Sequence, residues 1–260
     1  MRTSIALFFC LFSLSFLRVQ NDTSSVHSEK EISIVVIPFE PNEYFNDGDQ
    51  FICQNNNITP AQLDGVIRRS LEKILVEDLS VSYKSRKISD STKKNRKSDL
   101  ELLYAHTSYS LEDKPLKGYS SNVENNGLKS VLNFGGRKKS GDYVSDTKDL
   151  KKRQHRFFKA QLISDSSTGA ISKKYNEDYY LFISHFEMET RYKDCHDMAN
   201  NAFQRDIYVH YSLIDSKSNY VDGGVVCVTF QSSDKEIDKI LEKNFNLISN
   251  MIIDQIKTKI

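Results

Sequence analysis

Asp178-Tyr-Tyr-Leu-Phe-Ile-Ser-His-Phe-Glu-Met-Glu-Thr-Arg-Tyr192 is the stretch that decides the fold, because its apolar side chains alternate with the two-residue period of a β-strand. Both faces are apolar up to Ser184, which predicts a strand that begins covered on both sides. Beyond Ser184 one face turns polar, so the strand is expected to end half exposed. The expected faces are Tyr179, Leu181, Ile183, His185, Glu187 and Glu189 on one side, and Tyr180, Phe182, Phe186 and Met188 on the other.

Two further strands and a helix are predicted after this stretch. Residues 205–215 and 221–230 alternate in the same way and are joined through a Ser-Lys-Ser-Asn turn. Gly223-Gly224 interrupts the last strand, which indicates a bulge or a close backbone approach. Ser233-x-x-Glu236 has the spacing of a capping box, and a wide apolar stripe with helical period follows it. The last third therefore predicts a β-β-β-α unit.

The front of the chain predicts a second apolar block. Residues 31–39 are a nearly continuous β-branched run that ends at Pro38-Phe39. Residues 40–58 are rich in turn formers and are expected to be a loop. Thr59-Pro60-Ala61-Gln62 is a capping box for a helix that fades near Asp78, after which we expect a short strand at 80–83 and a helix at 98–108.

The fold class follows from these two blocks. We predict an α/β (α+β) domain over residues 31–260, with a mixed sheet of about 4–5 strands flanked by helices and ending in the β-β-β-α unit. Residues from about 111 to about 155 are dominated by Gly, Ser, Asn, Asp and Lys, which predicts a long disordered insertion.

The N-terminus predicts export. Arg2 precedes an apolar run from Ile5 to Leu17, which suits a signal peptide and is shorter than the ~20 residues of a membrane-spanning helix. We expect residues 1–18 to be the signal peptide, residues 19–30 a flexible leader, and the mature protein to be periplasmic or secreted with no transmembrane span. The alternatives are an uncleaved anchor and a buried strand.

The element order resembles a group of bacterial envelope domains. Ile34-Val35-Val36-Ile37-Pro38-Phe39 is similar to the opening of the TolB amino-terminal domain, the curli-secretion lipoprotein CsgG and the LpoB-type activators of peptidoglycan synthases. The tail from Asp178 through the last helix is similar to their β-β-β-α half. The chain departs from the lipoprotein members because it has no convincing lipobox. The resemblance implies a binding, scaffolding or secretion component.

The densest set of metal-type ligands is Asp194-Cys195-His196-Asp197 with His185 and His210 nearby. If the two long strands pair as a hairpin, His210 would face His185 or Glu187. A zinc site would need three or four such groups to converge, and the spacing matches no zinc pattern. The alternative, which we favour, is a solvent-exposed cross-strand ladder. We find no catalytic motif, and the sequence predicts no cofactor and no catalytic residue.

Two basic segments, 84–97 and 148–159, are candidates for binding an anionic partner, in an otherwise nearly neutral chain of net charge +1. The alternative is a solvated charged surface. Export makes nucleic acid an unsuitable partner, so an envelope protein or envelope polymer is expected. The residues concerned are Lys93, Lys94, Arg96, Lys97, Lys151, Lys152 and Arg153.

Three cysteines remain after the signal peptide. Cys53 and Cys195 lie in polar, loop-like stretches and are the pair expected to form a disulfide if any forms. Cys227 lies in an apolar strand, where a buried, inert thiol is expected. The alternative is three free thiols.

Three functions remain open from the sequence. The leading hypothesis is a non-enzymatic binding or assembly component of the cell envelope. The second is an exported hydrolase or metal-dependent enzyme with a site at the polar end of the sheet. The third is a structural domain that oligomerises through its edge strands.

Overall fold

The computed structural model describes residues 31–88, 98–121, 154–163, 166–192 and 203–260. Apart from Glu31, the described residues fall in one compact unit, Ile32–Ile260. The elements in chain order are β1 (Ser33–Ile37), a 3-10 turn (Pro41–Glu43), β2 (Tyr44–Asn46), α1 (Asp49–Asn56), α2 (Pro60–Leu79), β3 (Lys84–Lys87), α3 (Asp99–Ala105), β4 (Thr107–Pro115), β5 (Gly118–Ser121), β6 (Gln154–Leu162), α6 (Ser166–Tyr175), β7 (Tyr179–Thr190), β8 (Gln204–Asp215), β9 (Tyr220–Gln231) and α7 (Ile237–Ile256).

The main sheet is mixed, as predicted. Its strands follow the order β3-β1-β7-β8-β9-β5, and β2 pairs with β7 beyond the end of β1. The pairs β7–β8 and β8–β9 are antiparallel, whereas β1, β2, β3 and β5 pair in parallel with their neighbours. The described residues give seven strands rather than four or five, because β2, β3 and β5 are short strands without a clear alternating pattern.

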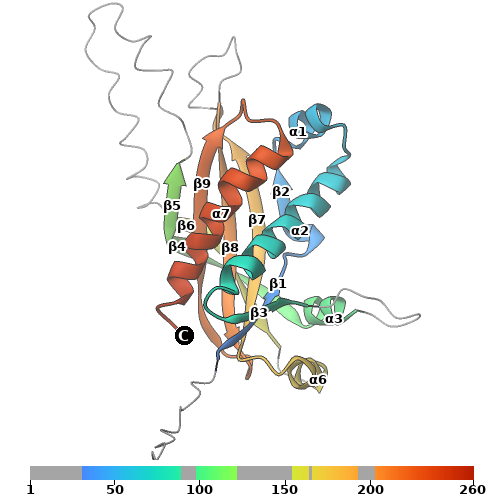
Figure 1. The fold of residues 1–260 in the computed structure, drawn as a ribbon, viewed down its shortest axis with the longest axis vertical. Helices are drawn as coiled ribbons and strands as arrows, with labels where there is room; N and C mark the ends of the chain where they lie inside the picture. Colours follow the sequence, from blue (N-terminus) through green and yellow to red (C-terminus); the bar gives the residue numbers. More distant parts are fainter. Residues whose placement is uncertain (1–30, 89–97, 122–153, 164–165, 193–202) are drawn as a thin grey trace, which may run out of the picture. The chain divides into compact units, whose positions relative to one another are not determined.

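Both faces of the main sheet are covered. Helices α2 and α7 lie side by side across one face (Figure 1), where they pack on Leu181, Val209 and the other inward side chains of that face. On the opposite face lie α3, α6 and a two-stranded antiparallel sheet formed by β4 and β6. We call this two-stranded sheet the ribbon. The double cover explains why β1 is a continuous apolar run: all five of its residues are buried.

The C-terminal β7-β8-β9-α7 unit confirms the predicted β-β-β-α order. The capping box of α2 is also confirmed, since Thr59 and Gln62 exchange both hydrogen bonds. The capping box at Ser233 is wrong, because α7 begins after Glu236 with no side-chain cap. The helix expected at 98–108 is shorter (α3), and the short strand expected at 80–83 lies at β3 instead.

Two segments expected to be irregular contain regular structure. The expected loop 40–58 holds β2 and α1. The expected insertion at about 111–155 starts too early, because residues 111–121 belong to β4, its connection and β5. Its expected end agrees with the start of β6 at Gln154. Residues 122–153 lie outside the described part. Helix α6 had no expected counterpart.

The glycine pair in β9 confirms the predicted close approach. The β8–β9 register shifts between Leu213 and Ile214, next to the glycines. A Cβ on Gly223 would lie 2.5 Å from the carbonyl oxygen of Tyr211 and 2.9 Å from Cζ of Phe157 on the ribbon. A side chain at this position would therefore obstruct the packing of the ribbon on the sheet.

Candidate functional site

A β-bulge decides which side chains face the ribbon. The β7–β8 register is regular except between Ile183 and His185, where Ser184 is the extra residue. Because successive side chains alternate, one extra residue moves every later side chain to the other face. Phe186 therefore joins Ile183 on the face under α2 and α7. The expected faces beyond Ser184 are wrong, since His185 lies on the ribbon side, stacked on Phe158.

The bulge assembles a cluster of His185, Glu187 and His210. His185 pairs with His210 across the two strands, as the hairpin prediction requires. The potential ligand atoms of the three residues lie within 4.8 Å of one another. The expectation of a solvent-exposed ladder is wrong, because His210 is buried and the ring of Phe158 stacks on His185 at 4.2 Å.

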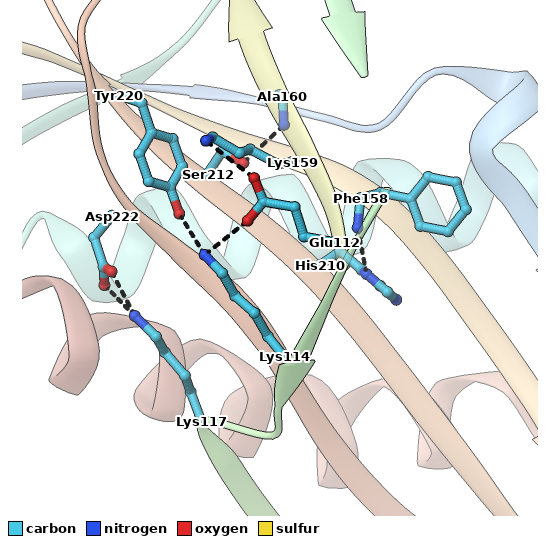
Figure 2. Close-up of polar contacts among 10 residues, drawn as sticks. All are labelled: Glu112, Lys114, Lys117, Phe158, Lys159, Ala160, His210, Ser212, Tyr220 and Asp222. Carbon is cyan, nitrogen blue, oxygen red and sulfur yellow. Dashed lines mark hydrogen bonds and ion pairs between the residues drawn. The ribbon is translucent and has the colours of Figure 1, made fainter. Parts of the chain in front are cut away.

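Polar side chains on this face hold the ribbon by its backbone. The Phe158 N–H donates to Nδ1 of His210 at 3.2 Å, and the Ala160 N–H donates to Oγ of Ser212 at 3.0 Å (Figure 2). The hydroxyl of Ser184 donates to the Phe158 carbonyl. Backbone groups in the interior need partners, and here the sheet's side chains supply them. His210 and the bulged Ser184 thus have a structural task.

The tautomer of His210 argues against a metal centre. A backbone N–H can only donate, so Nδ1 of His210 accepts and the proton of the neutral ring is on Nε2. A protonated Nε2 offers no lone pair to a metal. His185 differs, because its Nδ1–H donates to Oε2 of Glu43 at 3.0 Å and leaves Nε2 as a potential ligand. Of the three clustered residues, His185 and Glu187 alone can then ligate, and zinc needs three or four ligands.

Burial sets the protonation of the cluster. It lowers the pKa of His185 from its ordinary value, and the hydrogen bond to Glu43 opposes that shift. Burial also raises the pKa of Glu187 to about 8, with a further contribution from Glu189. Both side chains therefore favour their uncharged forms near neutral pH.

This protonation predicts a loss of stability as the pH rises from about 4.5 to about 8. Folded Glu187 keeps its proton up to about pH 8, whereas the unfolded chain releases it near the ordinary value of 4.5. The raised folded pKa contributes stability that is fully present below about pH 4.5 and is lost progressively until the pH reaches about 8. His185 acts in the opposite sense, through its lowered pKa, only below about pH 6.5. We expect the free energy of unfolding, from urea titrations between about pH 6.5 and about pH 9, to fall until about pH 8 and to level off above it.

The matched variants are Glu187→Gln, which mimics the neutral acid, and Glu77→Gln, which changes an exposed carboxylate of α2. The first should remove the fall in stability up to about pH 8 and the second should retain it. An equal fall in both variants would assign the effect to groups elsewhere.

A lysine cluster fastens the ribbon to β9 (Figure 2). Lys114 and Lys159 both contact the Glu112 carboxylate, at 3.3 and 3.2 Å. Lys159 also lies over the ring of Tyr220, at 4.4 Å, and Lys117, just after β4, contacts Asp222 at 2.5 Å. The described end of the basic segment 148–159 thus takes part in internal ion pairs.

The described part of the basic segment 84–97 also takes part in internal contacts. Arg86 of β3 pairs with the buried carboxylate of Glu177 and donates to the carbonyl of Tyr175. The predicted anion-binding residues themselves lie outside the described residues, so the structure places none of them: Lys93, Lys94, Arg96, Lys97, Lys151, Lys152 and Arg153.

Two of the three cysteines beyond the predicted signal peptide, Cys53 and Cys227, lie among the described residues. Cys227 is buried in β9, as predicted, and burial raises the pKa of its thiol well above the ordinary value. Cys53 carries a free thiol that is buried in α1. Cys195 lies outside the described residues, so the Cys53–Cys195 disulfide and the role of Cys195 as a ligand stay predictions.

Exposed aromatic side chains mark one end of the main sheet. Phe45 of β2 is 49% exposed, Phe51 of α1 is 49% exposed, and Tyr192, two residues beyond β7, is 57% exposed. Asp47 ties these segments together, because its carboxylate accepts from both the N–H and the hydroxyl of Thr190 at the end of β7. We call this region the aromatic end. Sequence reasoning missed it, because 40–58 was expected to be a loop.

Comparison with known proteins does not extend these findings. No protein-family model matches the sequence, and a search of curated proteins found no match. Among the described residues, the helices are too short or too polar to cross a lipid bilayer.

Proposed function

We propose that this chain is an exported cell-envelope protein that acts by binding, as an assembly or accessory component. The observation that carries the proposal is the aromatic end, where Phe45, Phe51 and Tyr192 are each about half exposed or more. Large aromatic side chains are enriched at the centres of protein interfaces, where they supply much of the binding energy. The resemblance to envelope binding and scaffolding domains, and the apolar N-terminal run, agree with this function and with its location.

The hydrogen bonds that the sheet makes to the ribbon also favour binding over catalysis. Ser184, Ser212 and His210 each contact the backbone of β6. A catalytic group must be able to reach a substrate, and these three groups lie beneath the ribbon. These three side chains thus hold the ribbon on the sheet, whereas the aromatic end presents side chains to solvent.

Site-specific crosslinking in the cells that produce the protein tests this function. A photoreactive amino acid at Phe51 or Tyr192 should yield a discrete adduct with one envelope component, because both side chains face solvent at the proposed surface. The matched control is Val81, an apolar residue that follows α2 and is 85% exposed. Mass spectrometry of the adduct identifies the partner. The same products from all three positions, or a chain retained in the cytosol, would contradict the proposal.

A metal-dependent enzyme is the second candidate, and the clustering of His185, Glu187 and His210 favours it. The tautomer of His210 opposes it. Adding zinc to the full chain and measuring its melting temperature distinguishes the metal-dependent enzyme from the binding protein. If zinc raises the melting temperature of the wild type and not of Glu187→Gln, the metal reading is supported. We expect no difference between the two proteins.

A further inference from the structure

Arg205 is a buried cation with unused hydrogen-bonding capacity. It is the second residue of β8, pairs with Thr190 of β7, and is 4% exposed. Within the described part of the chain, its Nε and Nη1 have no hydrogen-bond partner. Burial lowers the pKa of its guanidinium from the ordinary value. A buried guanidinium without acceptors is costly, and such groups normally bind carboxylate or phosphate oxygens.

The N-terminus of α1 lies against this guanidinium. Gly48 is the N-cap and supplies no side-chain cap. A Cβ on Gly48 would lie 2.9 Å from Cζ and 3.0 Å from Nη1 of Arg205, so the missing side chain leaves room for the guanidinium. In the described residues, the N–H groups of Asp49 and Gln50 have no acceptor. Free N–H groups and the helix dipole both favour an anion at this position.

The surrounding charges select the kind of anion. Asp47 acts on the guanidinium electrostatically, and its carboxylate is held by Thr190. Asp49 accepts from the hydroxyl of Tyr44 at 2.7 Å. These two neighbouring carboxylates oppose a doubly charged ligand, so one negative charge is the most that Arg205 and the helix end can balance.

The neighbouring aromatic rings favour an anion that is attached to an apolar group. The centroid of the Phe51 ring lies 5.8 Å from Cζ of Arg205, and about half of this side chain faces solvent. Tyr192 lies near the same guanidinium and is also exposed. An apolar or aromatic group attached to the anion would find contacts on these rings.

We propose that Arg205 and the first N–H groups of α1 form a binding site for a single carboxylate carried on an apolar residue, such as the free C-terminus of a peptide. The site rests on the proposed function and names the chemistry that the aromatic end recognises. Recognition of a terminal carboxylate by backbone N–H groups is an established mode of peptide binding.

NMR titration of the isotope-labelled full chain tests the site. The probes are N-acetylphenylalanine, its uncharged amide, and inorganic phosphate. We expect N-acetylphenylalanine to shift the amide signals of Gly48, Asp49 and Gln50 saturably, the amide to leave them unchanged, and phosphate to bind at least tenfold more weakly. Equal shifts with the acid and the amide, tighter binding of phosphate, or no shift at millimolar acid would overturn the proposal.

Two variants assign the binding to this geometry. Arg205→Met keeps the length of the side chain without its charge and should abolish the shifts. Gly48→Ala should displace the guanidinium and weaken binding at least tenfold while Arg205 keeps its charge. If Arg205→Met does not fold, Arg205→Lys replaces it, because a lysine retains the charge and loses the planar fork. Unchanged affinity in the folded variants would contradict the site.

The outcomes separate this inference from the proposed function. Crosslinks at Phe51 without binding of N-acetylphenylalanine would refute the carboxylate site and leave the binding function in place. Carboxylate binding without an envelope adduct would refute the assembly role and leave the site in place.

Discussion

Asp206→Asn is expected to lower the free energy of unfolding by about 3 kcal/mol, because it disrupts a buried ion pair from one side. Asp206 is 2% exposed and accepts from Nη2 of Arg191 at 2.9 Å, from Nε of the same residue, and from the hydroxyls of Thr229 and Tyr208. The variant leaves Arg191 with its full charge and a weaker acceptor. Urea unfolding of the full chain measures the change.

The matched control for Asp206→Asn is Glu77→Gln, which breaks an exposed pair with Lys73 at 3.7 Å. That change should stay within about 0.5 kcal/mol. The double variant Arg191→Met with Asp206→Leu should recover part of the stability, because a buried pair replaced by apolar side chains leaves no charge unpaired. A loss below about 1 kcal/mol in Asp206→Asn would contradict the buried network.

Gly223→Ala is expected to lower the free energy of unfolding by about 3 kcal/mol, because the added methyl group has no room. The nearest atom, the carbonyl oxygen of Tyr211, belongs to the neighbouring strand and cannot move without disturbing the sheet. Phe157 of the ribbon is the next neighbour, so the change should also loosen the ribbon. Thermal and urea unfolding measure the first effect, and hydrogen exchange in β6 measures the second.

Gly169→Ala provides the opposite result. Gly169 lies in α6 with nothing within 4 Å of an added Cβ, so alanine should stabilise the helix by about 0.5 kcal/mol or more. If Gly223→Ala also raised the free energy of unfolding, or left it unchanged, the steric explanation for Gly223 would be wrong.

The parts of the fold that were predictable are those whose signal is local. Alternation located β7, β8 and β9, and the Thr59–Gln62 pair located the start of α2. The buried Cys227 and the close approach at Gly223-Gly224 were also visible as local patterns.

The parts that were missed depend on distant residues. The ribbon has a polar sequence, and its β6 strand is held through backbone groups by Ser184, Ser212 and His210, far away in the chain. The bulge at Ser184 follows from pairing with β8, so the reversal of faces beyond it could not be derived from β7 alone.

The candidate site was predictable only in part. The pairing of His185 with His210 followed from the hairpin, whereas their burial required the ribbon. The aromatic end required Asp47 and α1 to approach the end of β7, inside a segment whose composition is typical of loops. Arg205 gave no signal, because an arginine at the start of a strand is usually exposed.

The ribbon side of the sheet and the aromatic end differ in what their side chains contact. On the ribbon side, polar side chains contact backbone groups and one another. Burial lowers the pKa of His185 and raises the pKa of Glu187, so both side chains favour their uncharged forms. At the aromatic end, apolar rings face solvent beside a buried guanidinium. The first arrangement stabilises a fold, and the second is suited to recognition.

Hydrogen exchange on the complex recovered by crosslinking tests whether the aromatic end is the binding surface. Relative to the free chain, we expect slower exchange in β2 and in the first turn of α1, and unchanged exchange in the ribbon. Slower exchange confined to β4 and β6, with no change in exchange at residues 44–51, would place the binding surface on the ribbon and contradict the proposed function.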